Sequence, residues 1–374
     1  MKIFEEILHN YGLSKNQSQE VSKKLNSLDY NNFQTFKDLM NSYPHPSQND
    51  VENYLIDPSN KAIISGIDYG GIDDLICGTI NNLKKETPPE EAYSKLIPYL
   101  NMVLQYEQQE NKHTHKGAIY FNIGQYLIKI GQIEKGLYFI HRGLIEDDMK
   151  HIGNMNFPNV WSYQIIILDE KLNHPYVKDM ILFLNDEFLK RNYNFNVFFD
   201  NFLDKPSKAI NNAIIWLNHI AFFHIFLFHL RKLYLLPEDL FKSILGEISS
   251  SNLIGDLCLL IESICKLKYP SINVSGRETF SNIYNHVKTQ YSWRGAPVNG
   301  PDFDLSNLNN TLSDIFSNSY QGSKDPFQNS FYLSWGLRNK VHHKIDSVRI
   351  IRENFKSIIE KQMEFFLDLV INKS

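Results

Sequence analysis

Apolar residues recur at helical spacing through most of the chain. In the C-terminal stretch over residues 330–371 they fall three, four or seven positions apart from Leu337 to Val370. This spacing places them on one side of a helix, so the pattern predicts a long amphipathic helix there. The same periodicity predicts three more helices, over residues 209–232, 237–266 and 276–291. We therefore predict an all-α fold.

The stretch over residues 117–148 predicts two helices joined by a tight turn. Its glycines fall at the turn and at positions where small side chains let two helices approach closely: Gly124, Gly131, Gly136 and Gly143. This pattern resembles a tetratricopeptide repeat (TPR). Because a lone repeat leaves its faces uncovered, we expect the helical stretches at residues 84–116 and 151–190 to stack on it as degenerate repeats. An ordinary helical hairpin is the alternative.

Turn-rich sequence separates the helical regions. An irregular stretch ends at Pro206, and we place a domain boundary there. The prediction is an N-terminal helical region over residues 1–83, TPR-like repeats over 84–205 and a helical bundle over 206–374. A connection over residues 293–329, dense in Gly, Pro, Asn and Ser, interrupts the bundle. A connection of that length inside a compact domain is typically functional or mobile.

The composition indicates a globular protein that is not coated in nucleic acid. The 374 residues are 43% hydrophobic and 21% charged, with a formal net charge of −4. That length allows a large core, whereas broad phosphate binding needs an excess of Lys and Arg. The cysteines Cys77, Cys258 and Cys265 are sparse and odd in number, which favours a reducing compartment. The N-terminus has no secretory pattern, so we predict a cytoplasmic location.

One apolar run needs comparison with a membrane span. Residues 213–230 carry no formal charge, but Asn218 and three histidines interrupt them: His219, His224 and His229. Polar groups of this kind are costly in lipid. The run therefore predicts a buried core helix, and we expect no membrane partner.

The strongest chemical signal is Arg338-Asn339-Lys340-Val341-His342-His343. Its Arg338-Asn339-x-x-x-His343 spacing resembles the Arg-x4–6-His signature of HEPN domains (higher eukaryotes and prokaryotes nucleotide-binding), in which a polar residue often follows the arginine. That family forms a small helical bundle with the motif near the start of its last long helix. The resemblance covers roughly residues 209–374. A solvated basic face on an amphipathic helix is the alternative.

The resemblance implies a metal-independent ribonuclease that needs no cofactor. Cleavage by attack of the RNA 2′-OH needs a base and an acid, and histidine serves as either near neutral pH. An arginine supplies a fixed, planar cation for the charged transition state. By this analogy His343 is the general acid/base, Arg338 stabilises the phosphate and Asn339 orients it. His342 and Lys340 are possible supporting residues, and His342 is a rival to His343.

The resemblance further implies an RNA substrate, catalysis between two copies of a homodimer and a 2′,3′-cyclic phosphate product. Proteins of this kind often act in bacterial anti-phage defence or toxin systems. The TPR-like region would receive a protein partner or trigger. Two alternatives stay open: a non-catalytic HEPN/TPR protein that dimerises or binds RNA or a nucleotide, and a pure helical-repeat scaffold.

Other polar residues give weaker signals. His113 and His115 have no metal-ligand partner at a suitable spacing, so we expect exposed loop histidines and no metal site. Three acids fall on the helix predicted over residues 237–266: Glu247, Asp256 and Glu262. One of them could hold the motif residues in position without contacting the substrate, but we expect ordinary surface acids.

Overall fold

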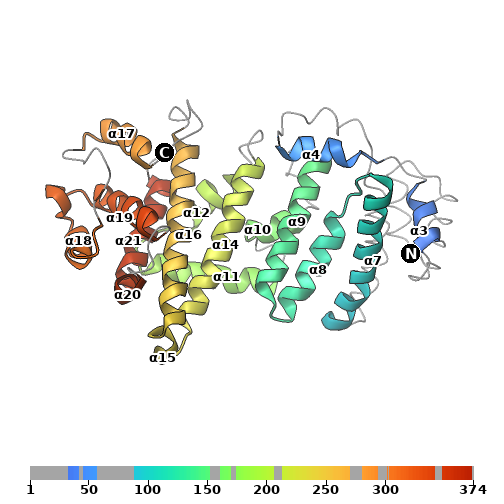
Figure 1. Ribbon diagram of the computed structural model, residues 1–374, viewed down its shortest axis with the longest axis horizontal. Coiled ribbons are helices and arrows are strands. Elements are labelled where there is room, and N and C mark those ends of the chain that lie inside the picture. The colour runs from blue at the N-terminus through green and yellow to red at the C-terminus, as the bar shows by residue number, and fades with distance from the viewer. Residues whose placement is uncertain are drawn as a thin grey trace. The chain divides into compact units, whose positions relative to one another are not determined.

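The computed structural model describes most of the chain as helices (Figure 1). The described residues are 33–41, 45–56, 88–151, 161–169, 174–205, 213–269, 280–293, 301, 303–341 and 348–372. Within these ranges there is no strand, and an isolated bridge joins Ser47 to Lys112. The predicted all-α fold is confirmed. Most of the region predicted over residues 1–83, together with Cys77, lies outside the described residues.

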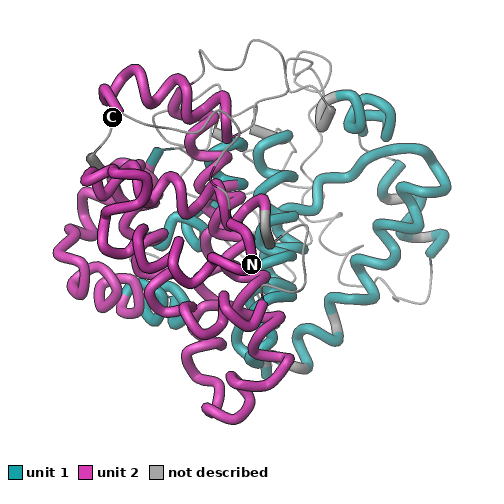
Figure 2. Tube along the Cα trace, turned by 60° about the vertical axis from the view of Figure 1, so that its left-hand side comes forward, with its two compact units in different colours: residues 1–181, 205–218 teal, residues 182–204, 219–374 magenta. Residues whose placement is uncertain are grey.

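The chain forms two compact units (Figure 2). Unit 1 comprises Met1–Ile181 and Lys205–Asn218, and unit 2 comprises Leu182–Asp204 and His219–Ser374. The chain therefore passes between the units three times: inside α11 (Pro175–Leu189), between Asp204 and Lys205, and inside α14 (Ala213–Tyr234). The three-part domain division proposed from the sequence stays a prediction.

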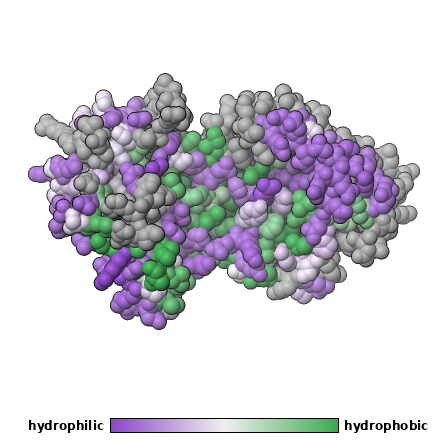
Figure 3. Space-filling model, viewed as in Figure 1, coloured by the Kyte–Doolittle hydropathy of each residue, from purple (hydrophilic) through white to green (hydrophobic). Residues whose placement is uncertain are grey.

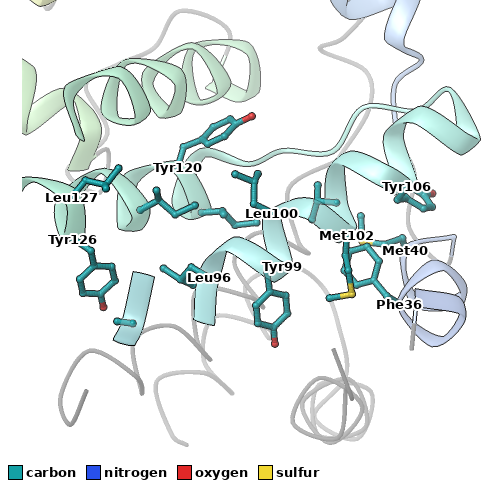
Figure 4. Close-up of a cluster of buried hydrophobic side chains, with 14 residues drawn as sticks. Phe36, Met40, Leu96, Tyr99, Leu100, Met102, Tyr106, Tyr120, Tyr126 and Leu127 are labelled. Atoms are coloured by element: carbon teal, nitrogen blue, oxygen red, sulfur yellow. The ribbon is translucent and has the colours of Figure 1, made fainter. Parts of the chain in front are cut away.

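Unit 1 is built on helices that pack in chain order. α3 contacts α7, α7 contacts α8, α8 contacts α9, and α10 contacts both α8 and α9. The bounds are α3 (Phe33–Met40), α4 (Gln48–Ile56), α7 (Pro89–Glu110), α8 (Gly117–Lys129), α9 (Ile133–His151) and α10 (Trp161–Ile166). A buried cluster joins α3, α7 and α8, and it includes Phe36, Tyr99, Tyr106, Ile123 and Leu127 (Figure 4).

Glycines set the close approach of α8 and α9. Gly131 lies in the turn with φ +81°, a left-handed conformation that favours glycine. A Cβ added at Gly124 would lie 2.8 Å from the carbonyl oxygen of Gly136, and one at Gly143 would lie 3.0 Å from that of Gly117. The turn and the close packing that the sequence predicted at these glycines are therefore confirmed.

Unit 2 is a helical bundle around α16. This helix contacts α15, α17, α19, α20 and α21. The bounds are α12 (Phe195–Phe198), η3 (Phe199–Leu203), α15 (Glu238–Phe241), α16 (Ile244–Lys268), α17 (Phe280–Gln290), α18 (Leu308–Phe316), η6 (Tyr320–Gly322), α19 (Pro326–Val341), α20 (Val348–Glu353), α21 (Phe355–Leu367) and η8 (Asp368–Asn372). An aromatic core lies between α14 and α21, where the rings of Phe223 and Phe366 stack at 5.0 Å.

The single helix predicted over residues 330–371 is wrong. In one continuous helix, Phe327 and Phe365 would lie roughly 57 Å apart at ~1.5 Å per residue. Their ring centroids lie 4.8 Å apart, because α21 folds back against α19. The HEPN-like motif therefore begins in the last turns of α19, next to a reversal of the chain.

The described part of the 293–329 connection is packed onto the bundle. It contains α18 and η6. At its start Trp293 Nε1 donates a hydrogen bond to Asp325 Oδ2 at 2.8 Å. The ring of Phe303 lies over Gly336, so closely that a Cβ there would come 1.4 Å from Phe303 Cε2. The glycine thus makes room on α19 for an aromatic side chain of this connection.

Among the described residues, one helix is long and apolar enough to cross a membrane. It is α16, and 56% of its most apolar window is buried. A single helix of this kind is weak support for a membrane span, since core helices meet the same criteria. The run singled out at residues 213–230 lies in α14 and carries buried side chains such as Leu217, Phe223 and Leu227.

Candidate functional site

The guanidinium of Arg338 is fixed at the end of α19. Its Nε donates a hydrogen bond to Glu262 Oε2 at 3.1 Å, and its Nη1 lies 3.4 Å from Asn339 Oδ1. The Arg338 side chain is 36% exposed, whereas that of Glu262 is 5% exposed. Arg338 is thus held from behind by a buried carboxylate on α16 while part of it faces solvent.

Glu262 binds a second cation. Lys266, one turn along α16, places Nζ 2.9 Å from Glu262 Oε1, and its side chain is 34% exposed. One buried carboxylate therefore organises two partly exposed cations. The group carries a net positive charge, which suits an anion. Our expectation of an ordinary surface acid is wrong for Glu262. Glu247 is 16% exposed and pairs with Arg352 at 3.7 Å, away from this group.

The buried thiol of Cys258 lies one turn before Glu262 on α16. Gln362 is buried, and its Nε2 donates to Cys258 Sγ at 2.8 Å. Burial raises the pKa of the Cys258 thiol to about 12, against the opposing effect of that hydrogen bond. The thiol is therefore protonated at neutral pH and serves as packing. The part of Arg338 that a ligand can reach is its exposed side.

The structure brings together part of the predicted motif. Arg338 and Asn339 lie side by side, and Asn339 is exposed. The backbone of Lys340 belongs to α19, while its side chain, His342 and His343 lie outside the described residues. Sequence reasoning missed Lys266. The Glu-x-x-x-Lys spacing is visible in the sequence, but nothing there connects it to an arginine 76 positions away.

A second polar cluster lies in unit 1, and it corrects another expectation. His113 and His115 are 5% and 4% exposed, so the prediction of exposed loop histidines is wrong. His113 Nε2 lies 2.9 Å from Glu146 Oε2, and His115 Nε2 lies 3.3 Å from Asp147 Oδ1. The histidines are buried beside carboxylates that α9 supplies, and Glu146 lies 33 positions along the chain from His113.

Lys116 completes this buried cluster. Its Nζ contacts Glu107 on α7 and lies 3.2 Å from Glu146 Oε1 on α9, with 2% of the lysine side chain exposed. Burial alone would lower the pKa of Lys116, but the two carboxylates raise it above its ordinary value. Burial would likewise raise the pKa of Glu146, but His113 and Lys116 hold it well below its usual range. Lys116 and Glu146 therefore form a buried ion pair, and Lys116 joins α7 to α9 through its two carboxylate contacts.

The two clusters differ in what they can do. Among the described residues, no group of three His, Cys, Asp or Glu side chains could hold a metal ion. The Lys116 cluster is enclosed, and its cation is already shared by two carboxylates. The Arg338 cluster carries excess positive charge at the surface. We therefore take Arg338, Asn339, Glu262 and Lys266 as the candidate functional site.

No family model matches the chain, and no curated protein and no solved structure is significantly similar to it.

Proposed function

We propose that the protein is a metal-independent endoribonuclease of the HEPN type. The observation that supports this most is the guanidinium of Arg338. It is fixed by the buried Glu262 at 3.1 Å, is 36% exposed and stands beside Asn339. A fixed cation with one side in solvent is what a charged phosphoryl transition state requires.

In the proposed reaction the RNA 2′-oxygen attacks the adjacent phosphorus and the bond to the 5′-oxygen breaks. The 2′-OH proton leaves to a base, and an acid returns a proton to the 5′-oxygen. The products are a 2′,3′-cyclic phosphate end and a 5′-OH end. Arg338 and Lys266 bind the phosphate oxygens, Asn339 orients them, and His343 acts as general acid/base. His342 and Lys340 are supporting candidates.

Glu262 is a positioning residue in this proposal. It touches no substrate, but it fixes the direction of Arg338 and Lys266. Glu262→Gln keeps a hydrogen-bond acceptor and loses the charge. We expect the variant to cleave about 10-fold more slowly, by analogy with the 10–100-fold cost of losing a group that orients a metal ligand. A structural role alone would lower the stability of the variant without changing the cleavage rate of its folded fraction.

The wider proposal is a homodimer in which two motifs line one cleft, joined to a TPR-like module that receives a protein trigger. The helices of unit 1 support the module, since α7 to α10 pack in chain order with glycines at the α8–α9 contact. A cytoplasmic role in bacterial anti-phage defence or a toxin system follows from the same resemblance.

The test is cleavage of single-stranded RNA by the full chain in EDTA. We expect cleavage by the wild type and a loss of 100-fold or more in Arg338→Ala and His343→Ala, the range for removing a transition-state contact. Arg349→Ala is the matched control, because Arg349 is 74% exposed and pairs with Glu353 on α20. RNA binding without cleavage by the wild type would favour the non-catalytic HEPN/TPR alternative.

A further inference from the structure

Exposed apolar side chains gather on α14, α15, α16 and the chain between them in unit 2. Figure 3 shows hydrophobic surface in this part of the molecule. Nine large side chains between 36% and 75% exposed belong to it: Phe222, Ile225, Tyr234, Leu235, Leu240, Ile244, Leu245, Ile248 and Leu259. Single exposed apolar residues are ordinary, but a concentration of this kind marks an interaction surface.

The solvent-facing side of α16 is a continuous stripe. Leu245, Ile248, Asn252 and Leu259 are exposed at spacings of three, four and seven, which keeps them on one face over about 21 Å. The most apolar window of this helix has a mean hydropathy of 1.4, but only 56% of it is buried. A helix this apolar gains by covering its outer side.

We propose that this face packs against the same face of a second copy of the chain. In the proposed pairing two α16 helices run antiparallel about a two-fold axis at Asn252. Leu245 then lies opposite the partner's Leu259, and Asn252 lies opposite the partner's Asn252. Two side-chain amides can hydrogen-bond to each other there, and the partly exposed Asp256 of each copy lies opposite the partner's Ile248. A two-fold interface of this type uses the same patch on both copies.

The acids Glu238 and Asp239 lie beside Leu240 at the α15 end of the face. An anionic lipid surface would meet these acids, which disfavours lipid as the occupant. We therefore take a second copy of the chain as the occupant, and the apolar area supports this choice.

The apolar area suits a dimer. The exposed fractions of the nine side chains equal about four whole side chains, or roughly 400 Å² at ~100 Å² each. A standard homodimer interface buries about 500 Å² of apolar surface per partner. Polar atoms around the patch would supply the remainder of the contact.

This interface goes beyond the proposed function and is independent of it. Ten positions separate Asn252 from Glu262, so pairing about Asn252 keeps the two Glu262 residues about 30 Å apart. A cleft shared by two motifs therefore needs a different contact, and the two contacts together would build an assembly larger than a dimer. The α16 pairing stands even if the protein cleaves no RNA.

The first test is the mass of the full chain in solution by light scattering. We expect the wild type at two or more times the 43.7 kDa of one chain, and half the wild-type mass for Ile248→Glu with an unchanged circular dichroism spectrum. Asn282→Glu, at an exposed position of α17, is the matched control and keeps the wild-type mass. A wild type of one chain, or an Ile248→Glu variant of wild-type mass, overturns the proposal. Loss of phospholipid-vesicle binding in Ile248→Glu, with a wild type of one chain, would assign the face to lipid.

The second test is a cross-link at the two-fold axis. In a Cys77→Ser background we expect Asn252→Cys to form a disulfide-linked pair of chains on mild oxidation, since the remaining Cys258 and Cys265 are buried. Asn282→Cys gives no such pair. Equal cross-linking of the two variants, or none at Asn252→Cys, contradicts the antiparallel arrangement.

Discussion

Replacing Lys116 by methionine tests the buried charged bridge of unit 1. Methionine keeps much of the apolar stem and removes the ammonium. In the wild type this ammonium is 2% exposed and contacts the carboxylates of Glu107 and Glu146. Without it the two buried carboxylates lose their shared cation. Breaking a buried pair typically costs 3–5 kcal/mol. Because His113 still lies 2.9 Å from Glu146, we expect the lower end, about 3 kcal/mol.

The assay is urea denaturation at pH 7, supported by a thermal melt in which unit 1 loses roughly 6–12 °C. Adding Glu107→Gln to Lys116→Met should restore part of the loss, since it removes one of the two uncompensated charges. Arg349→Met is the matched control: its ion pair with Glu353 is 74% and 44% exposed, so this variant should unfold at the wild-type urea midpoint. A Lys116→Met protein within 0.5 kcal/mol of the wild type, by the same urea assay, would refute the reasoning.

Three further predictions concern buried groups. Burial, with a smaller effect of Lys129, lowers the pKa of His174 from 6.5 to about 4. The unfolded chain therefore takes up this proton first, and stability falls by up to about 3 kcal/mol as the pH drops from 6.5 to 4. His174→Asn can keep the hydrogen bond from the backbone N–H of Tyr176. The urea midpoint of this variant should change less with pH over that window than the wild-type midpoint does, and an equal pH dependence contradicts this. Burial raises the pKa of Cys258 and Cys265 to about 12, so mass spectrometry should find both unmodified by iodoacetamide at pH 8 until denaturant is added, and rapid native labelling would be inconsistent with it. Gly336→Ala should cost about 1–3 kcal/mol by crowding the ring over α19, despite a helix-propensity gain of about 1 kcal/mol; a more stable variant in the urea assay would show that the ring moves freely.

The sequence was informative about local structure. Helical periodicity located the helices that became α14, α16 and α17 to within a few residues at most ends. Glycine chemistry located the α8–α9 turn, because φ +81° at Gly131 favours that residue type. These signals are local: they depend on neighbours within two turns of the same helix.

Long-range contacts were beyond the same reasoning. The apolar period continues from Val341 to Phe355, so it could not show that α21 folds back on α19. The buried state of His113 depends on Glu146, 33 positions away. Likewise, Glu262 and its partner Arg338 belong to helices that are distant in sequence. In each case the partner comes from another helix, and residue spacing alone carries no information about it.

The central proposal is RNA cleavage without a metal at Arg338, and the chemistry of the product ends tests it most directly. Wild-type protein would be incubated with a defined single-stranded RNA in EDTA, and the masses of the fragments would be measured by mass spectrometry. The proposal predicts 2′,3′-cyclic phosphate and 5′-OH ends, which disappear with Arg338→Ala and persist with Arg349→Ala. Intact RNA in EDTA, or 3′-OH and 5′-phosphate ends that form only when Mg²⁺ replaces EDTA, would contradict it.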